Sequence, residues 1–356
     1  MPSSPPAHPA ETPRVLIIRR RDVGDVLLLA STLYDLKAQW PTAKIALLVD
    51  RSCSEAARLH GTLDQLLVFP TRLPQWPGFW QTLRRSGFTH VLDLDNTAPS
   101  AGVTWLTRAP HRATWERPPR RVRFGRVYHH ITRLPTMGNG RHLTDDYGAA
   151  MGAWGVERRS ANHRIHPRAR DLDRARSLVA GPQLRVGVHV GTRSPTLAWP
   201  AERFARLCDR LQDERDAQVF LLGGRRESRV IEKIRSQAET HLTRLDPQLT
   251  LGELGAVISQ LDLLVCHDSD AMLLAAAVGT PVVALYGSQD ATIRRPPGSA
   301  HAVLRPQSPC TCAATGQMPA SCIKSDPHQS YCVRRLDEAT VFDAVVSQLS
   351  QHRPSA

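Results

Sequence analysis

Short apolar runs that alternate with amphipathic stretches constrain the fold of this chain more than any other feature. The first run, Arg14–Arg19, precedes helical spacing of apolar residues over Gly24–Trp40 and a second run at Lys44–Val49. Buried strands of a parallel sheet have this continuous apolar character. Such alternation with short connections predicts right-handed βαβ units and an open parallel sheet.

The second half of the chain repeats this pattern after a segment, Ala109–Leu143, that contains four prolines and predicts irregular structure. We therefore expect an α/β protein with two Rossmann-like domains facing across a cleft, where a ligand binds at the carboxyl ends of the strands. The expected parts are a disordered tail at 1–12, an N-terminal domain at 13–165, a C-terminal domain at 166–335, and a closing helix and tail at 336–356.

Charge is the clearest compositional signal. The 356 residues include 46 Lys and Arg against 33 Asp and Glu, a net charge of +13. Such an excess predicts attraction to an anion, whether nucleic acid, an anionic membrane face or a phosphorylated substrate. No apolar run is long enough for a transmembrane helix, and the N-terminus lacks a secretory signal, so we expect a cytoplasmic protein.

The turn after the first expected strand, Arg21-Asp-Val-Gly-Asp-Val-Leu27, is the first candidate site. Gly24 permits a tight turn, and Asp25 falls on the first turn of the following helix. Two interpretations are open: Asp25 caps the helix, or its carboxylate acts on a ligand.

Three strand ends in the second half carry further candidates. In His189-Val-Gly-Thr-Arg-Ser194, the Thr192, Arg193 and Ser194 side chains are suited to phosphate oxygens, although an ordinary loop would look similar. The Leu221–Glu227 segment turns at Gly223 and Gly224. A polar cluster, Asp268, Ser269 and Asp270, opens a helix at a position typical of a diphosphate or ribose site.

An arginine-rich segment spans residues 108–133, with eight arginines and a single carboxylate, Glu116. Arg120, Arg121 and Arg123 are suited to bidentate contacts with phosphates or carboxylates; the alternative is a solvated basic loop. No RNA-binding signature accompanies the arginines, so we expect no nucleic-acid partner.

Four cysteines, Cys310, Cys312, Cys322 and Cys332, lie within a short stretch near the C-terminus. Four thiols are suited to tetrahedral zinc or iron. The Cys-x-Cys spacing is tighter than the usual Cys-x2-Cys, so reduced thiols or disulfides are equally open.

In order and spacing, these blocks resemble the bacterial heptosyltransferases of glycosyltransferase family 9. The resemblance runs from Arg14 to about Leu349, and the matching blocks are Gly24-Asp-Val-Leu27, His189-x-Gly191, Trp199-Pro200, Glu202-Arg-Phe204, Leu222-Gly-Gly224, Asp268-Ser269 and Leu285-Tyr-Gly287. It implies the GT-B fold, and transfer of heptose from an ADP-sugar to the anionic, lipid-linked inner core of lipopolysaccharide. It also implies inversion at the anomeric centre and no catalytic metal. The positive charge is compatible with peripheral contact with the cytoplasmic face of the inner membrane.

Carried over residue by residue, the resemblance makes Asp25 the general base and places Thr192 and Arg193 at the donor phosphates. Glu227 and Leu249 match segments that line the nucleoside, and Asp268 and Ser269 face the donor. Ser194, Gly223, Gly224 and Asp270 complete the expected donor site; Gly24, Arg120, Arg121 and Arg123 form the acceptor side.

Two positions depart from the family pattern. Leu197 stands where the family has a phosphate-binding lysine, and Leu273 stands where it has a histidine. Both losses, with Asp270 gained at a helix start, would weaken diphosphate binding. An alternative function is therefore that of a catalytically impaired paralogue that binds nucleotide or glycan or serves in assembly.

Overall fold

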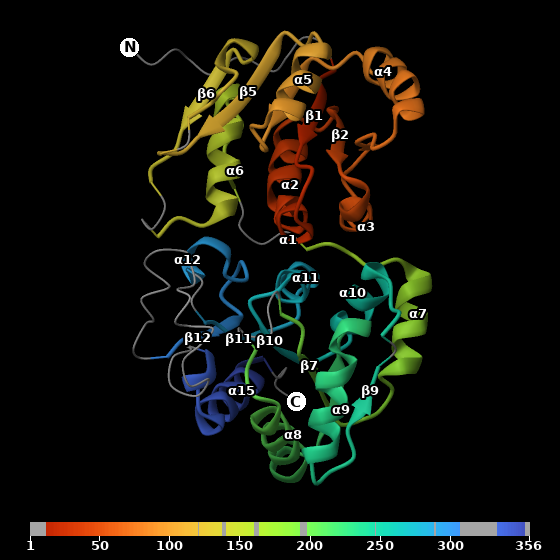
Figure 1. Cartoon of the computed structure of the whole chain (residues 1–356), viewed down its shortest axis with the longest axis vertical. Helices are drawn as coiled ribbons and strands as arrows, with labels where there is room; N and C mark the ends of the chain where they lie inside the picture. The colour runs from red at the N-terminus through yellow and green to blue at the C-terminus, as the bar shows by residue number, and fades with distance from the viewer. Residues whose placement is uncertain are drawn as a thin grey trace. The chain divides into compact units, whose positions relative to one another are not determined.

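A computed structural model of the chain describes residues 12–119, 121–136, 140–159, 164–192, 198–245, 247–287, 290–306 and 333–352. The chain divides into two compact units, Met1–His166 and Pro167–Ala356 (Figure 1), which we call unit 1 and unit 2. Each unit is built around one parallel six-stranded sheet covered by helices.

The sheet of unit 1 has the order β3-β2-β1-β4-β5-β6. Its strands are β1 (Arg14–Ile18), β2 (Lys44–Val49), β3 (Gln65–Val68), β4 (His90–Asp93), β5 (His111–Glu116) and β6 (His130–Arg133). From β1 the chain adds β2 and then β3 toward one edge of the sheet. It then returns to the other side of β1 and adds β4, β5 and β6 toward the opposite edge. The carboxyl ends of β1 and β4 are therefore the switch point at which open α/β sheets bind ligands.

Six α-helices accompany this sheet within the described part of unit 1: α1 (Val23–Leu27), α2 (Leu29–Gln39), α3 (Ser54–Arg58), α4 (Trp76–Arg85), α5 (Ala98–Leu106) and α6 (Leu143–Met151). Helices α4 and α5 cover one face of the sheet, where Phe79, Leu83 and Val103 pack against strand residues such as Leu16 and Val91. Helix α2 packs against α6.

The expectation of an irregular segment over Ala109–Leu143 was wrong, because β5 and β6 lie within it. These strands have polar sequences, His-Arg-Ala-Thr-Trp-Glu and His-Ile-Thr-Arg, and β6 is an edge strand with no fully buried residue. An edge strand needs no continuous apolar run, so the pattern that marks central strands is missing.

The sheet of unit 2 has the order β12-β11-β10-β7-β8-β9. Its strands are β7 (Leu184–His189), β8 (Ala217–Leu222), β9 (Thr243–Arg244), β10 (Leu263–His267), β11 (Val282–Leu285) and β12 (His301–Leu304). The helices described are α7 (Ala169–Leu178), α8 (Ala201–Arg215), α9 (Ser228–Gln237), α10 (Leu251–Ser259), α11 (Asp270–Val278), α12 (Ala291–Arg294) and α15 (Glu338–His352). The switch point of this sheet lies between β7 and β10.

The C-terminal residues belong to the core of unit 2. Val341, Phe342 and Val345 of α15 are buried in the same cluster as the strand residues of β7, β8, β10 and β11. The Trp199 indole donates a 2.8 Å hydrogen bond to the Leu336 carbonyl, and the Arg203 guanidinium donates to the carbonyls of Arg334 (2.7 Å) and Leu336. Across the described residues, no helix has the length and apolarity needed to span a membrane.

Candidate functional site

The switch point of unit 1 brings two charged strand ends together. Ile18 pairs with Asp93 in the β1–β4 register, and the Leu94 amide donates to the Ile18 carbonyl at 3.0 Å. Arg19 and Asp95, which follow the two strands, meet at this edge: Arg19 Nη1 lies 3.1 Å from Asp95 Oδ1.

Asp25 reaches the same edge from the first turn of α1. The residue is 5% exposed, and its carboxylate forms an ion pair with the Arg19 guanidinium. One arginine therefore bridges two buried carboxylates, those of Asp25 and Asp95. Burial raises the pKa of Asp95, and the positive charge of Arg19 opposes that rise.

Asp22, and not Asp25, caps α1. The Asp22 carboxylate accepts from the backbone amides of Gly24 (3.1 Å) and Asp25 (3.4 Å), and its φ of 73° lies in the left-handed region that aspartate tolerates better than most residues. Asp22 is therefore the N-cap of α1, and the Asp25 carboxylate contacts Arg19.

The buried carboxylate of Asp93 forms hydrogen bonds with the loop that follows β4. Asp93 is fully buried, and it accepts a 2.6 Å hydrogen bond from the Tyr128 hydroxyl and 3.0 Å bonds from the amides of Asp95 and Asn96. Burial raises the pKa of Asp93 to about 6, although the hydrogen bond from Tyr128 opposes the rise. These bonds fix the loop that carries Asp95.

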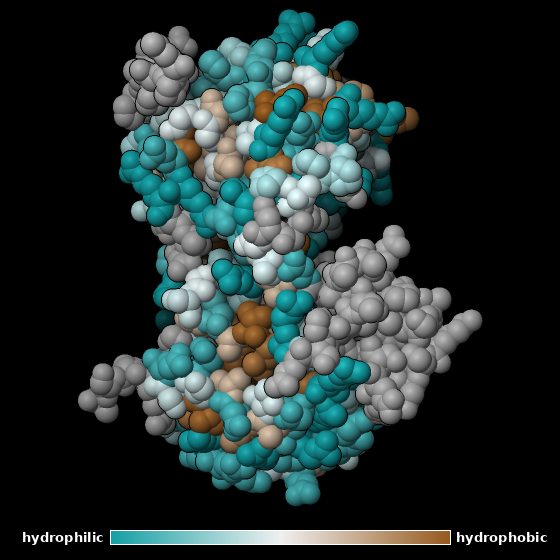
Figure 2. Space-filling model, turned by 90° about the vertical axis from the view of Figure 1, so that its left-hand side faces the viewer, coloured by the Kyte–Doolittle hydropathy of each residue, from teal (hydrophilic) through white to brown (hydrophobic). Residues whose placement is uncertain are grey.

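The arginine-rich segment divides into structural and exposed members. Arg117 pairs with buried Asp146, Arg112 donates to the carbonyls of Ala109 and Val127 (both 2.6 Å), and Arg133 pairs with Glu116 at 3.0 Å. Arg121 and Arg123, two of the expected acceptor residues, are exposed; Arg120 lies outside the described residues. Figure 2, which views unit 1 from the side of β6, shows a mainly hydrophilic surface.

At the switch point of unit 2, His189 of β7 pairs with Cys266 of β10 in register. The turns that follow these strands contain Thr192 on one side and Asp268 and Ser269 on the other, so strand pairing brings these expected donor residues to one edge. Gly191 is required in the first turn, because a Cβ there would lie 2.5 Å from Cε1 of the His189 ring.

Two buried polar atoms at this edge have no partner among the described residues, His189 Nδ1 and Ser269 Oγ. The Trp199 amide donates to His267 Nε2 at 2.8 Å, so His267 is neutral with its proton on Nδ1. Burial, together with the neighbouring His189, lowers the pKa of His267 to about 4, although a backbone hydrogen bond with Gly191 opposes the shift. Ser269 occupies the N-cap position of α11, yet its hydroxyl makes no capping bond.

The neighbouring strand end holds the expected glycine turn. Gly223 and Gly224 follow β8, which pairs with β7, and the Glu227 carboxylate folds back so that Oε2 would lie 3.3 Å from a Cβ at Gly224. Leu249 is half-buried ahead of α10, beyond the edge strand β9. Arg193, Ser194 and Leu197 lie outside the described residues; Leu273 is buried within α11.

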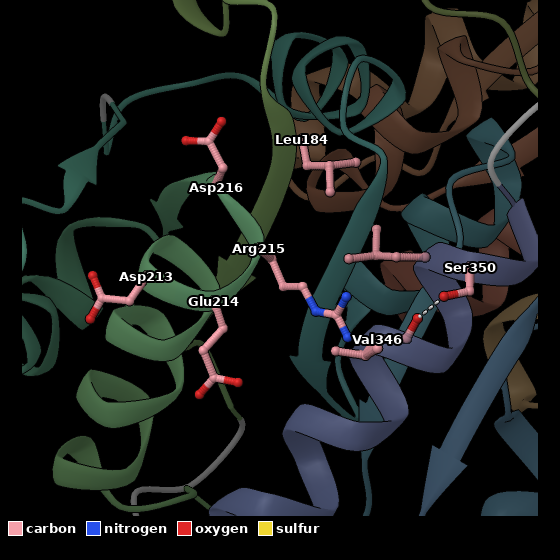
Figure 3. Close-up of a pocket in the computed structure, with 8 residues that line it drawn as sticks. Leu184, Asp213, Glu214, Arg215, Asp216, Val346 and Ser350 are labelled. Atoms are coloured by element: carbon pink, nitrogen blue, oxygen red, sulfur yellow. Dashed lines mark hydrogen bonds between the residues drawn. The ribbon is translucent and has the colours of Figure 1, made fainter. Parts of the chain in front are cut away.

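A cavity of about 310 Å³ lies elsewhere in unit 2, between the end of α8 and α15 (Figure 3). Its wall includes Leu184, the first residue of β7, and Asp216, which immediately precedes β8. It therefore lies at the amino ends of the strands, opposite the edge where parallel sheets bind ligands, and we do not assign the site to it.

The structure describes no group of three or more His, Cys, Asp or Glu side chains arranged to hold a metal, in the ranges given above. Cys53, Cys208 and Cys266 are buried free thiols. The Cys310, Cys312, Cys322 and Cys332 set lies outside those ranges, so a zinc or iron site there stays a prediction.

Sequence reasoning missed Arg19 and Asp95 in unit 1 and His267 in unit 2 as members of these edges. A usable signal was present, because each stands at or directly after the end of a buried strand next to the switch point. Their pairing joins residues distant in sequence, which spacing alone does not reveal.

The chain is similar to a known protein family and to several solved structures. The model of glycosyltransferase family 9 (heptosyltransferase) matches residues 76–323. Lipopolysaccharide heptosyltransferase 2 of Salmonella typhimurium is 22% identical over 293 residues, covering 77% of this chain and 82% of that protein. A family 9 glycosyltransferase structure from Veillonella parvula superposes with a TM-score of 0.80 at 20% identity, covering 95% of this chain and 98% of that one. The E. coli heptosyltransferase WaaC, solved with ADP, gives 0.72 at 17% identity, covering 94% and 99%.

The expected fold class, α/β of the GT-B type with two Rossmann-like domains, is confirmed by the two parallel sheets and by these structural neighbours. The family match spans more than half of the chain and includes most of unit 2. The protein therefore belongs to glycosyltransferase family 9, the heptosyltransferase family, and is a glycosyltransferase.

Proposed function

We propose that this enzyme transfers a heptose or a related sugar from an ADP-sugar to an anionic lipopolysaccharide inner-core acceptor, with inversion and with Asp25 as general base. The observation that carries the proposal is the placement of Asp25: a buried carboxylate at the switch point of unit 1, held by Arg19 and not used as a helix cap. The similarity to lipopolysaccharide heptosyltransferases supports the substrate class.

In the proposed step, the acceptor hydroxyl gives its proton to Asp25 as its oxygen attacks the anomeric carbon. The bond from that carbon to the diphosphate oxygen breaks on the opposite face, and ADP leaves with the electron pair. Arg19 orients Asp25 and stabilises it as an anion, the form that accepts a proton. Asp95 shares the guanidinium and so limits the positive charge acting on Asp25.

Unit 2 is proposed to hold the donor. Thr192, Ser269 and the Gly223–Gly224 turn, with Arg193 and Ser194, would contact the diphosphate, while Glu227 and Leu249 would line the nucleoside. Asp268 and Asp270 would face the donor sugar. Support comes from the edge of β7 and β10, where buried polar atoms lack partners within the described part of unit 2. The ADP in the WaaC structure supports this nucleotide.

Gly24, Arg120, Arg121 and Arg123 are proposed to contact the acceptor. The exposure of Arg121 and Arg123 leaves their guanidinium groups accessible to phosphate or carboxylate. A lipid-linked acceptor further implies a cytoplasmic enzyme in peripheral contact with the inner membrane, with no nucleic-acid partner and no required cofactor.

A second candidate, the catalytically impaired paralogue, rests on one observation. Leu273, which replaces the family histidine, is buried in α11, and carboxylates flank Ser269 where a diphosphate would bind. Such a protein would bind nucleotide or glycan without transferring sugar.

The test compares Asp25→Asn with Asp22→Asn, the same chemical change three residues away. Asparagine caps a helix as well as aspartate does, so Asp22→Asn should retain activity. Loss of a general base should lower kcat about a thousandfold, within the usual range for such groups, and leave ADP affinity unchanged. Equal kcat in wild type and Asp25→Asn would refute the base assignment. ADP binding by wild type without transfer from any ADP-, UDP- or GDP-sugar would favour the paralogue.

A further inference from the structure

The helices α4 and α5 of unit 1 present a surface unlike the rest of the described chain. Four large apolar residues are classed as exposed in the described ranges, and the two most exposed are Leu73 (85%) and Trp105 (62%). Leu73 begins the 3-10 turn that leads into α4, and Trp105 lies on α5. Both helices pack on the same face of the sheet and are drawn in orange in Figure 1.

Partly buried aromatic side chains of this region pack against the core of unit 1. The rings of Trp76 and Trp80 contact each other with centroids 5.2 Å apart and planes tilted by 32°, and both residues are only partly buried. Phe69 and Phe79 pack against Trp76 edge-on and support it from the core side. Tryptophans with one edge buried and the other near the surface are typical of proteins that lie at a membrane–water interface.

The sequence that forms this surface has more exposed cations than carboxylates. The exposed Asp64, just before it, forms ion pairs with Lys37 and Lys44. Between Gln65 and Trp115 the sequence contains two acidic residues, Asp93 and Asp95, and both are buried at the switch point. The exposed cations are Arg72, Arg84, Arg85 and Arg108, and none forms an ion pair with any residue in the described ranges. We call Arg72, Leu73, Arg84, Arg85, Trp105 and Arg108 the α4/α5 face.

We propose that the α4/α5 face docks on an anionic phospholipid membrane. Arginines attract the headgroups, while Leu73 and Trp105 insert at the interface. A nucleic acid would match the charge but gives no reason for a leucine with most of its surface in water. The 3-10 turn Gly125–Val127, between Arg123 and the start of β6, packs against α5, so the docked face would adjoin arginines assigned to the acceptor.

This inference deepens the proposed lipid-linked acceptor, but its test does not depend on transfer. Full-length protein is sedimented with vesicles of phosphatidylcholine alone and of phosphatidylcholine mixed with phosphatidylglycerol. Binding should occur only to the anionic vesicles and should fall as salt rises. Replacing Arg72, Arg84 and Arg85 by glutamine should lower the partition coefficient about a hundredfold, given the usual contribution of each basic residue near such a surface.

The matched control replaces three exposed arginines of unit 2, Arg206, Arg215 and Arg229, by glutamine, which removes the same net charge. This control should change the partition coefficient by less than about threefold, because these arginines are not part of the α4/α5 face and exposed charges are screened by salt. Equal losses in both triple variants, or no binding by wild type, would overturn the proposal. Binding to an RNA oligonucleotide that the α4/α5 triple abolishes, with vesicle binding intact, would also overturn it.

Insertion of the apolar residues is tested separately. Brominated phosphatidylglycerol quenches tryptophan fluorescence on contact, and Trp105→Phe should remove a large part of that quenching. Leu73→Ser should lower vesicle binding about tenfold, whereas Val230→Ser, at an exposed apolar position of α9, should not. Transfer to a water-soluble acceptor fragment should be unchanged in Leu73→Ser, which separates failure of docking from failure of the proposed chemistry.

Discussion

The carboxyl edges of the two sheets differ in how their polar groups are satisfied. In unit 1, charges pair with one another: Arg19 bridges Asp25 and Asp95, and Arg20 pairs with Asp50 at 2.9 Å. In unit 2, His189 Nδ1 and Ser269 Oγ are buried without a partner among the described residues, and the carboxylates of Asp268 and Asp270 flank Ser269.

This difference indicates which kind of interaction each edge is suited to. Paired charges are fixed before any substrate arrives, which suits a group that must receive a proton in one geometry. Buried polar atoms without partners cost free energy until a ligand supplies the hydrogen bonds. This difference agrees with the proposed roles, in which unit 1 supplies the general base and unit 2 binds the donor.

The largest expected effect comes from breaking the charge network of unit 1. Arg19→Met leaves Asp25 and Asp95 buried beside an apolar side chain, so the opening free energy of β1 and β4 should fall by about 3–5 kcal/mol. Native-state hydrogen exchange of the amides in these strands measures it. Arg21→Met is the control, because the Arg21 side chain is 76% exposed and lies 3.7 Å from its partner Asp50; it should cost less than about 0.5 kcal/mol.

A second prediction concerns the pH dependence of unit 1. Burial raises the pKa of Asp93 from 3.8 to about 6, so the folded protein keeps this proton to a higher pH than the unfolded chain does. The contribution of Asp93 to stability therefore falls as pH rises from about 4 to 6, by about 3 kcal/mol. Urea unfolding of wild type and Asp93→Asn at several pH values measures it. A difference between the two proteins that is constant across this range would contradict the prediction.

Adding nucleotide should affect the two edges unequally. At a concentration one hundred times its Kd, ADP should stabilise the unit that binds it by about 2.7 kcal/mol. Hydrogen exchange should slow at the ends of β7 and β10 and remain unchanged at β1 and β4. Equal protection of both sheets would remove the distinction between a binding edge and a reaction edge.

The smallest effect separates binding from folding at a single hydroxyl. Ser269→Ala removes a group that makes no capping bond, so the free energy of unfolding should change by less than about 0.5 kcal/mol. The same change should weaken ADP binding about tenfold, as measured by calorimetry, because a hydrogen bond to the diphosphate is lost. Ser236→Ala, on the exposed side of α9, should change neither quantity.

Much of the fold could be predicted from the sequence, because the central strands of a parallel sheet have a recognisable, nearly continuous apolar pattern. The runs at Arg14–Arg19, Lys44–Val49 and Leu184–Val190 are mainly apolar, since helices cover both faces of the sheet, and the strands lie at those positions. Strands β5 and β6 were missed because β6, at the edge of the sheet, and β5, beside it, are only partly buried and have polar sequences. The helix expected over Gly24–Trp40 divides at Leu28 into α1 and α2, a break that apolar spacing does not encode.

The candidate site could be anticipated only as strand ends. That Gly24, Asp25 and Asp268 follow strands is visible in the sequence, and pairing of the strands then decides which of them meet. Arg19 could not be assigned to Asp25 from spacing, because the choice between Asp25, Asp95 and solvent depends on the β1–β4 register. The roles of the site residues in binding and catalysis stay predictions.

Trp199 and Arg203 donate hydrogen bonds to carbonyls that follow Val333, and these bonds limit how far the chain can be truncated from its C-terminus. The family match ends at residue 323, yet the carbonyls that receive the Trp199 indole and the Arg203 guanidinium come later, as do Val341, Phe342 and Val345 of the core. A fragment that ended at residue 323 would lack α15, so the apolar residues of unit 2 that pack against this helix would be exposed. The Trp199 indole would also lose the Leu336 carbonyl that accepts its hydrogen bond. Any minimal version of the C-terminal half must therefore run through α15.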